Sequence, residues 1–300
     1  MSAPSIPVEA ERRELRPAPQ PLRRSLAKVP VYVLLAIGAI FALVPFVWMV
    51  STALKTPGQL FKFPPEWIPN PVAWGNFGEA WSALPFGAMV LNSVFVTTLA
   101  MVGELGSAAV VAYGFARFQF RFRSSLFLLM LSTMMLPWVV TLIPGFLIWK
   151  QAGLINTFDP LTVGSLFAWG PFYVFLLRQF FLGVSRDIEE AAIVDGANAL
   201  QVLWYVMLPL VRPVLLAVAV LSFQGNWNNF KGALIYIQEP LTRFTLPLGL
   251  QFFQASISNE APRWHLMMAM SLLMVIPVVI LFFLAQRQFI EGIQLGGVKG

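Results

Sequence analysis

Hydrophobic residues fill six long stretches of the chain, and clusters of polar, glycine or proline residues separate them. Each stretch approaches the roughly 20 residues that an α-helix needs to cross the hydrocarbon core of a bilayer. The pattern therefore predicts an all-α, polytopic membrane protein with six transmembrane helices. We place these helices at about 29–54, 86–113, 126–149, 161–181, 209–226 and 264–284.

Proline lies inside several of these spans. Pro45 in the first span predicts a kink rather than a break, because neighbouring helices can satisfy the carbonyl that proline leaves free. Pro137 and Pro144 lie in the third span, which we expect to be one helix. Residues 55–85 are rich in Pro, Trp and Asn, and we expect an ordered external loop there.

Composition supports the membrane assignment and limits the kinds of reaction that the chain can catalyse. The chain is 58% hydrophobic and 11% charged with a mean hydropathy of +0.73, whereas soluble domains carry roughly 25% charged residues. It has no cysteine and one histidine, and it lacks a phosphate-binding G-x-x-x-x-G-K-[ST] loop and a G-x-S-x-G motif. We therefore expect no cofactor and no enzyme activity, so energy for any active transport must come from a partner.

The distribution of charge predicts how the chain sits in the membrane. Residues 1–28 hold prolines, arginines and glutamates and predict a disordered cytoplasmic tail. A transmembrane domain follows at 29–286, with a cytoplasmic C-terminal tail at 287–300. Most Lys and Arg residues then lie on one side, which the positive-inside rule makes the cytoplasm, with both termini there. Basic cytoplasmic loops explain the net charge of +6, so we expect no nucleic-acid partner.

The main polar interruption, 187–209, predicts a cytoplasmic helix–turn–helix elbow. Asp187 suits an N-cap, with Glu190 three residues later as the return member of a capping box. The first helix is expected to stop at Gly196, where a residue without Cβ can adopt positive φ. A second helix at about 199–207 leads to Pro209. The alternative is an amphipathic loop resting on the membrane surface.

The elbow resembles a known family motif. Glu190, Ala191 and Ala192 are followed after three residues by Gly196 and after nine more by Val206-Met207-Leu208-Pro209. This spacing resembles the EAA loop in the membrane subunits of binding-protein-dependent ABC importers, with Val206 in place of the family's Ile. The segments AYGFARFQFRFRS, FQGNWNNFKGALIYI, TLPLGL and GGVKG resemble the maltose-type sugar permeases of that family.

This resemblance implies a permease subunit in a bacterial or archaeal cytoplasmic membrane that moves a sugar through the lipid bilayer. The implied partners are a second permease subunit, two ATPase subunits and an extracytoplasmic sugar-binding protein. The residues expected to dock the ATPases are Glu190, Ala191, Ala192, Gly196, Leu208 and Pro209.

Two further groups are candidates for the substrate pathway. Glu104 lies within the second span. An ionised acid at the bilayer centre costs about 2.5–3.5 kcal/mol, so a glutamate at such a position suggests a function. The alternative is that Glu104 has a helix-packing role beside small residues. Asn226, Trp227 and Asn228 combine an aromatic face with amides, which suits sugar recognition, or they cap a span. The alternative function is a stand-alone channel or secondary transporter that uses Glu104.

Overall fold

The computed structural model describes residues 28–256 and 263–296, including the side chains of 28–255 and 263–286. The chain divides into two units, 1–49 and 50–300, and each is described by itself. In the first unit the described part belongs to helix α2 (Val29–Ala53), whose last turn lies in the second unit. The helix runs without a break through Pro45. The predicted tail at 1–28 lies, except for Lys28, outside the described residues.

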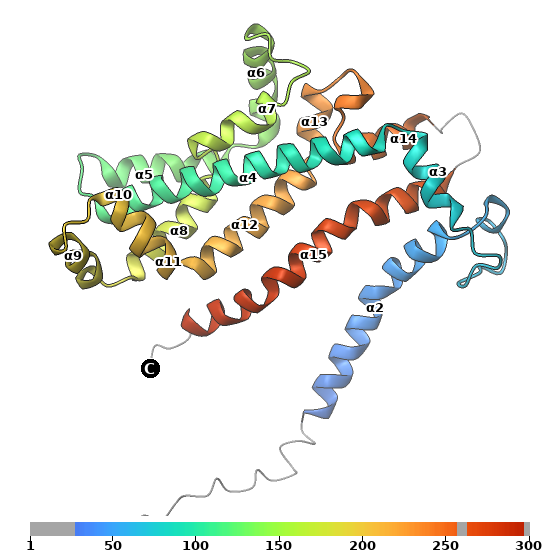
Figure 1. The fold of residues 1–300 in the computed structure, drawn as a ribbon, viewed down its shortest axis with the longest axis horizontal. Helices are drawn as coiled ribbons and strands as arrows, with labels where there is room; N and C mark the ends of the chain where they lie inside the picture. Colours follow the sequence, from blue (N-terminus) through green and yellow to red (C-terminus); the bar gives the residue numbers. More distant parts are fainter. Residues whose placement is uncertain (1–27, 257–262, 297–300) are drawn as a thin grey trace, which may run out of the picture. The chain divides into compact units, whose positions relative to one another are not determined.

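Helix α4 (Phe86–Arg117) is the central element of the second unit. It packs against α8 (Pro171–Gly183) and α12 (Arg212–Trp227), and α12 packs in turn against α15 (Trp264–Gly296) (Figure 1). Its buried positions include many small residues, namely Ser93, Ala100, Gly103, Ala108, Ala109, Ala112 and Ala116. Small side chains let helix backbones approach closely, which replaces the hydrophobic driving force that is missing between helices in lipid.

The third predicted span is two helices and not one. Helix α5 (Arg123–Ser132) continues through the 3-10 turn η2 (Thr133–Met135), and α6 (Trp138–Gln151) follows at an angle of 98°. The break falls at Leu136, which is extended with ψ 118°. The ring of Pro137 disfavours helical geometry in the residue before it, so our prediction of a single helix was wrong. Pro144, by contrast, stays inside α6.

The fourth span is also irregular. It begins as α7 (Asp159–Thr162), tightens into the 3-10 segment η3 (Val163–Phe167) and resumes as α8. Between them Ala168 has φ 53°, a left-handed conformation that ends the first part. The elbow follows as α9 (Arg186–Val194), α10 (Ala199–Gln201), the π-helical segment η4 (Val202–Met207) and α11 (Leu208–Leu210). The chain then bends by 85° into α12.

Short elements connect the other ends of the long helices. They are η1 (Pro57–Gln59), α3 (Gly75–Ala83), α13 (Phe230–Tyr236), η5 (Leu241–Arg243) and α14 (Leu246–Ser256). Helix α3 is attached to the end of α2: the Asn76 side-chain amide donates to the carbonyls of Ala53 and Lys55 at 2.8 Å each. Two hydrophobic clusters result, one around the elbow end of α4, α8 and α12, the other where α3, α14 and α15 meet.

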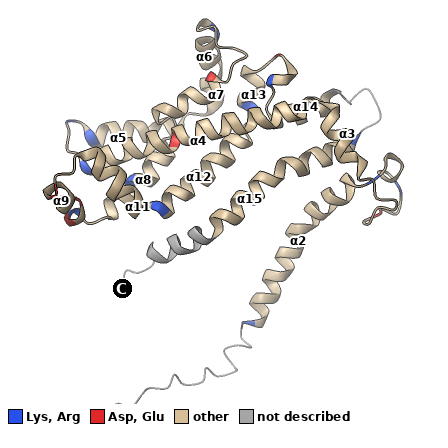
Figure 2. Cartoon of the chain, in the orientation of Figure 1, with Lys and Arg blue, Asp and Glu red and all other residues tan. Residues whose placement is uncertain are grey.

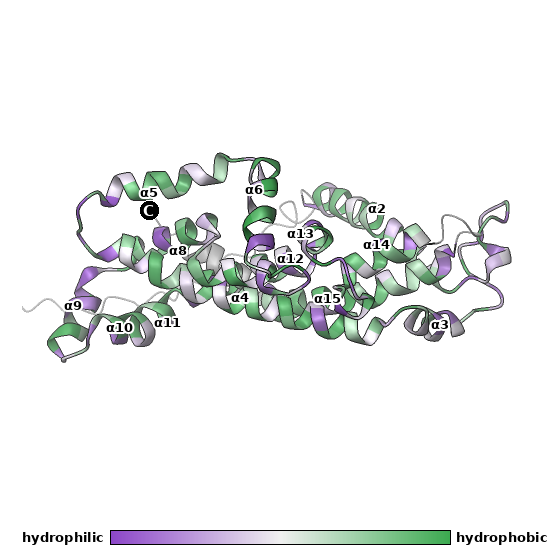
Figure 3. Ribbon diagram, turned by 90° about the horizontal axis from the view of Figure 1, so that it is seen from above, coloured by the Kyte–Doolittle hydropathy of each residue, from purple (hydrophilic) through white to green (hydrophobic). Residues whose placement is uncertain are grey.

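Length and composition identify the membrane-crossing helices. Among the described residues, four helices are long and apolar enough to span a bilayer, and the number rises to six if each bent pair counts as one span. Hydrophobic colour follows the long helices, and hydrophilic colour gathers at α9 and in the loops (Figure 3). The all-α, multi-pass prediction is confirmed. Helix α15 continues to Gly296, past residue 287, where we placed the start of the C-terminal tail.

Candidate functional site

The elbow is a helix–turn–helix, as the sequence predicted, but its first cap is Ser185 and not Asp187. The Ser185 hydroxyl accepts a bond from the Asp187 backbone N–H at 3.3 Å and donates to the Asp187 carboxylate at 2.9 Å. Asp187 therefore lies inside the first turn of α9, where its negative charge suits the positive end of the helix dipole. The predicted capping box between Asp187 and Glu190 is not formed.

Gly196 makes the turn between the two halves of the elbow. It has φ +89°, and its N–H donates to the Ile193 carbonyl at 2.9 Å. The N–H of Ala197 donates to the Ala192 carbonyl at 3.0 Å. This pair of bonds is a Schellman motif, which satisfies the last carbonyls of α9 and needs a left-handed residue at the glycine position. The prediction that Gly196 ends the first helix is confirmed.

The second half of the elbow has its own start signal. The side chains of Asn198 and Gln201 bond each other's backbone N–H at 3.0 and 2.8 Å, which forms a complete capping box. Helical structure then continues through Pro209 to Leu210. Along this half Leu208 is buried, whereas Pro209 is exposed.

The candidate docking residues divide into two groups by burial. Glu190, Ala191, Gly196 and Pro209 are exposed, so a partner can reach them. Ala192 and Leu208 face inward: Leu208 is a buried member of the hydrophobic cluster at this end, and Ala192 packs against the cluster. The structure thus brings four of the six residues to the surface of the elbow and uses the other two to attach the elbow to the spans.

One elbow residue outside the predicted docking residues is Glu189. Its carboxylate accepts a hydrogen bond from the Tyr113 hydroxyl at 2.6 Å and forms an ion pair with Arg117, with 2.9 Å between Nε and Oε2. Tyr113 and Arg117 lie at the end of α4. The signal available in the sequence was a basic residue closing the second span and two consecutive acids in the elbow, but nothing local shows which acid turns inward.

The side chain of Glu104, a residue of α4, contacts α12. The Ser222 hydroxyl donates to its Oε2 at 2.5 Å, and the Asn226 amide donates to the same oxygen at 3.3 Å. Asn226 also donates to the Ser222 carbonyl at 2.9 Å. These three side chains, which we call the polar strip, place a carboxylate, a hydroxyl and an amide together within the helix bundle. The strip joins two candidate pathway residues that lie far apart in the sequence.

The other two candidates on α12 lie elsewhere. Trp227 is 2% exposed, its ring stacks on Phe223 with centroids 5.4 Å apart, and its indole N–H donates to the Met274 carbonyl at 3.1 Å. It therefore packs against α15 in this conformation. Asn228 is exposed and caps α12 by donating to the Gln224 carbonyl. Of the three residues, only Asn226 joins the polar strip.

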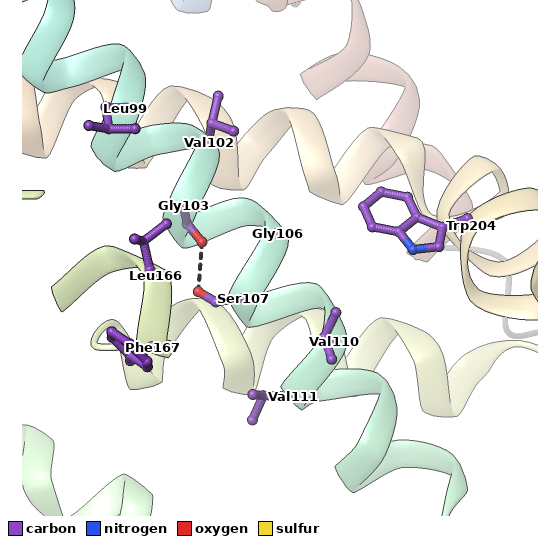
Figure 4. A pocket seen from close by; sticks show the side chains of 10 residues that line it. All are labelled: Leu99, Val102, Gly103, Gly106, Ser107, Val110, Val111, Leu166, Phe167 and Trp204. Atoms are coloured by element: carbon purple, nitrogen blue, oxygen red, sulfur yellow. Dashed lines mark hydrogen bonds between the residues drawn. The ribbon is translucent and has the colours of Figure 1, made fainter. Parts of the chain in front are cut away.

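An open apolar groove runs beside α4. Its volume is about 610 Å³, and Leu166 and Phe167 of η3 and Trp204 of the elbow contribute to its wall. The Ser107 hydroxyl donates to the Gly103 carbonyl at 2.7 Å along this wall (Figure 4). The Ser165 carbonyl is an alternative acceptor for the same hydroxyl at 2.7 Å, and the Ala168 N–H donates to Ser107 Oγ at 3.1 Å, which ties α4 to the end of η3. Gly103 and Ser107 therefore serve the packing of α4 on η3, whereas Gly106 borders the open groove.

The fold and the elbow together define a multi-pass membrane transport subunit. The sequence profile of the family described as "Binding-protein-dependent transport system inner membrane component" matches residues 105–294. This match covers more than half of the chain, and the protein belongs to that family. It is a transport permease and not an enzyme, and the resemblance seen in the elbow sequence is confirmed.

Two relatives are similar in sequence to this protein along nearly its whole length. The protein is 33% identical over 279 residues to the probable ABC transporter permease protein YurM of Bacillus subtilis, covering 92% of this chain and 90% of YurM. It is 34% identical over 268 residues to the diacetylchitobiose uptake system permease protein DasC of Streptomyces coelicolor, covering 89% of this chain and 95% of DasC.

A solved structure shares the fold. It is the crystal structure of a bacterial ABC transporter involved in the import of the acidic polysaccharide alginate, in which one chain superposes with a TM-score of 0.76 and 24% identity. The match covers 90% of this chain and 99% of that one. At this identity the likeness establishes the arrangement of helices alone.

Proposed function

We propose that this permease moves a sugar across a bacterial or archaeal cytoplasmic membrane, together with a second permease subunit, two ATPase subunits and an external sugar-binding protein. The observation that carries the proposal is the elbow: a rigid Schellman turn at Gly196, with Glu190 and Ala191 exposed beside it. The uptake of diacetylchitobiose named for DasC supports a sugar as the substrate class.

The proposed mechanism is mechanical. ATP binding closes the ATPase dimer, the docked elbows move with it, and the spans rock between inward-open and outward-open states. Docking uses the exposed residues Glu190, Ala191, Gly196 and Pro209. Ala192 and Leu208 hold the elbow on the helix bundle, so that movement of the elbow reaches the spans.

The elbow is proposed to face the cytoplasm, where ATP is available. Charged residues gather at the α9 end of the second unit and are sparse along the middle of the long helices (Figure 2). Arg117, Arg121, Arg123 and Arg186 lie at this end, near the termini of α4, α5, α8 and α9. Clustered Arg near the ends of spans marks the cytoplasmic side.

The polar strip is the proposed contact for the sugar. A carboxylate, a hydroxyl and an amide supply both acceptors and donors, which is what sugar hydroxyls require. Glu104 and Asn226 carry this role. Trp227 supports it indirectly by fixing the end of α12 against α15, and Asn228 caps the same helix.

Co-purification and reconstitution test the proposal together. The chain, expressed with its genomic neighbours and purified through a tag, is expected to bring an ATPase and a second permease subunit with it. Proteoliposomes containing that complex should take up sugar only with ATP inside and the binding protein outside. Mass spectrometry of ligand released from the binding protein names the sugar. Uptake by the chain alone, without an ATPase, would instead establish a solitary carrier.

A further inference from the structure

Two consecutive glutamates of the elbow point in different directions. The Glu189 side chain is 12% exposed, whereas Glu190 is exposed. Neighbouring residues of an α-helix are separated by about 100° around the axis, so α9 turns Glu189 toward the spans while Glu190 faces outward. The charge of Glu189 is therefore satisfied inside this subunit.

Both carboxylate oxygens of Glu189 are held by α4. The Tyr113 hydroxyl donates to Oε1, and Arg117 Nε pairs with Oε2. Tyr113 and Arg117 are four residues apart on α4 and so lie on the same face of that helix. One directed hydrogen bond and one ion pair thus hold the Glu189 carboxylate against α4.

The same arginine also reaches α8. Its Nη2 donates to the carbonyl of Val184, the residue after α8 ends, at 2.8 Å. The Tyr113 ring packs edge-on against Phe181 of α8, with centroids 6.0 Å apart. Three elements, α4, α8 and α9, therefore meet around one ion pair whose arginine side chain is only 6% exposed.

Helix α9 also packs against η4 of the same elbow. Within α9, all of which the structure describes, no residue is fully buried, and Ala192 is only partly buried against the cluster. Apolar contacts between small side chains permit sliding, whereas separating a buried ion pair leaves charges unpaired in a low-dielectric region. Glu189 adds a direct polar connection from α9 to α4, through an ion pair and a hydrogen bond. Glu104 lies on the same helix, about 20 Å along its axis from Arg117.

We propose that Glu189, Arg117 and Tyr113 form a joint that converts movement of the elbow into movement of α4. This inference rests on the proposed function, because it needs an ATPase docked on the elbow. Glu189 is a positioning residue in this arrangement, and its exposed neighbour Glu190 is left for docking.

The test uses the complete importer, with its partner permease, ATPases and binding protein, reconstituted in proteoliposomes. Glu189→Gln keeps an acceptor for Tyr113 and removes the charge that faces Arg117, and Tyr113→Phe removes one hydrogen bond. Asp195→Asn is the matched control, since it removes a carboxylate from an exposed position at the end of α9. Each variant is measured for ATPase co-purification, ATP hydrolysis and sugar uptake per ATP hydrolysed.

Glu189→Gln is expected to retain its ATPases and to lose about fivefold or more in uptake per ATP, because the buried arginine loses its counter-charge. Tyr113→Phe should lose about twofold, since a single hydrogen bond is removed, and Asp195→Asn should match the unsubstituted complex. Exchanging the charges, with Arg117→Glu and Glu189→Arg together, should recover part of the uptake per ATP that Arg117→Glu alone loses.

A distance measurement separates transmission from simple stability. The chain has no cysteine, so spin labels can be attached to this subunit only at Gln119→Cys, just after α4, and Asp187→Cys in α9, before assembly with its partners. The label distance should stay narrow with and without nucleotide in the otherwise unsubstituted complex, and it should broaden when Glu189→Gln is added.

Three results would overturn the inference. The first is normal uptake per ATP together with unchanged label distances in Glu189→Gln. The second is loss of ATPase co-purification in Glu189→Gln, which would assign Glu189 to docking. The third applies if Glu189→Gln fails to insert into the membrane, and it is normal uptake per ATP in Tyr113→Phe. An unsubstituted chain that binds no ATPase would overturn the proposed function itself, which distinguishes the two failures.

Discussion

Ser222 on α12 donates a hydrogen bond to Glu104 on α4 at 2.5 Å, across 118 positions of sequence. The bond places the polar side chains of two separate spans at one point in the bundle. Because a polar group inside a membrane is costly unless it is satisfied, the two helices are held in register there.

Changes at Glu104 should alter sugar handling. A hydrogen bond to a charged group contributes about 1.5–3 kcal/mol, against about 0.5–1.5 for a neutral one. Glu104→Gln should therefore raise the KM for uptake by about tenfold, and Glu104→Leu should abolish uptake. ATPase co-purification should not change in either variant. Uptake kinetics in proteoliposomes check this, and an unchanged KM in Glu104→Leu would place the polar strip outside the pathway.

Gly196→Val should abolish uptake while membrane insertion continues. A β-branched residue at φ +89° is strongly disfavoured, by about 1–3 kcal/mol, and redirects the second half of the elbow. Gly196→Asn is the control, because asparagine tolerates the left-handed region and space around the Cβ is open. Uptake and ATP hydrolysis are measured on the whole complex. Normal coupling in Gly196→Val would remove the elbow as the coupling element.

Substituting alanine for each of two glycines of α4 should change the stability of the protein in opposite directions. A Cβ at Gly103 would lie 2.5 Å from the Ser165 hydroxyl oxygen, whereas a Cβ at Gly106 meets nothing within 4 Å. Gly103→Ala should lower stability by about 1–3 kcal/mol through overpacking. Gly106→Ala should raise it by about 0.5–1 kcal/mol through its better helix propensity. Thermal unfolding in detergent compares the two, and equal melting temperatures would contradict the close packing of α4 on η3.

Trp227 should affect stability more than affinity. Trp227→Ala removes a buried ring and should cost about 3–5 kcal/mol, and Trp227→Phe should cost about 0.5–1.5 kcal/mol for the lost bond to Met274. Asn228→Ala, at an exposed cap, is the comparison. Melting temperature and KM are both recorded. A Trp227→Phe protein with normal stability and a greatly raised KM would show that the indole contacts sugar.

Labelling of single cysteines should report the topology. A cysteine at Gln119 or Asn198 is expected to be protected from an impermeant thiol reagent in intact cells, and one at Gly78 should react. Gln119 is used in place of Arg123, the first residue of α5. The Arg123 guanidinium donates to the carbonyls of Phe115 and Ala116, and a cysteine at that position would remove these bonds. Reaction at Asn198 from outside would exclude docking of a cytoplasmic ATPase on the elbow.

Several features could be predicted because their causes are local. The spans follow from uninterrupted apolar length, and the turn at Gly196 follows from the freedom of a residue without Cβ. The break at Pro137 has a local cause too, yet we expected a continuous helix, because proline is tolerated inside membrane helices when neighbours satisfy the backbone. Pro45 and Pro144 lie inside helices, so the residue type alone does not distinguish the two outcomes.

The sequence by itself thus determined the class of protein, the approximate spans and the presence of an elbow. Only the tertiary structure decided that Glu189 rather than Glu190 turns toward α4, that Glu104 meets Ser222 and Asn226, and that Trp227 packs against α15. Each of these outcomes depends on the rotation of one helix against another. The hydrophobic pattern constrains that rotation weakly, since membrane helices are apolar on nearly every side and pack through small residues and a few polar contacts.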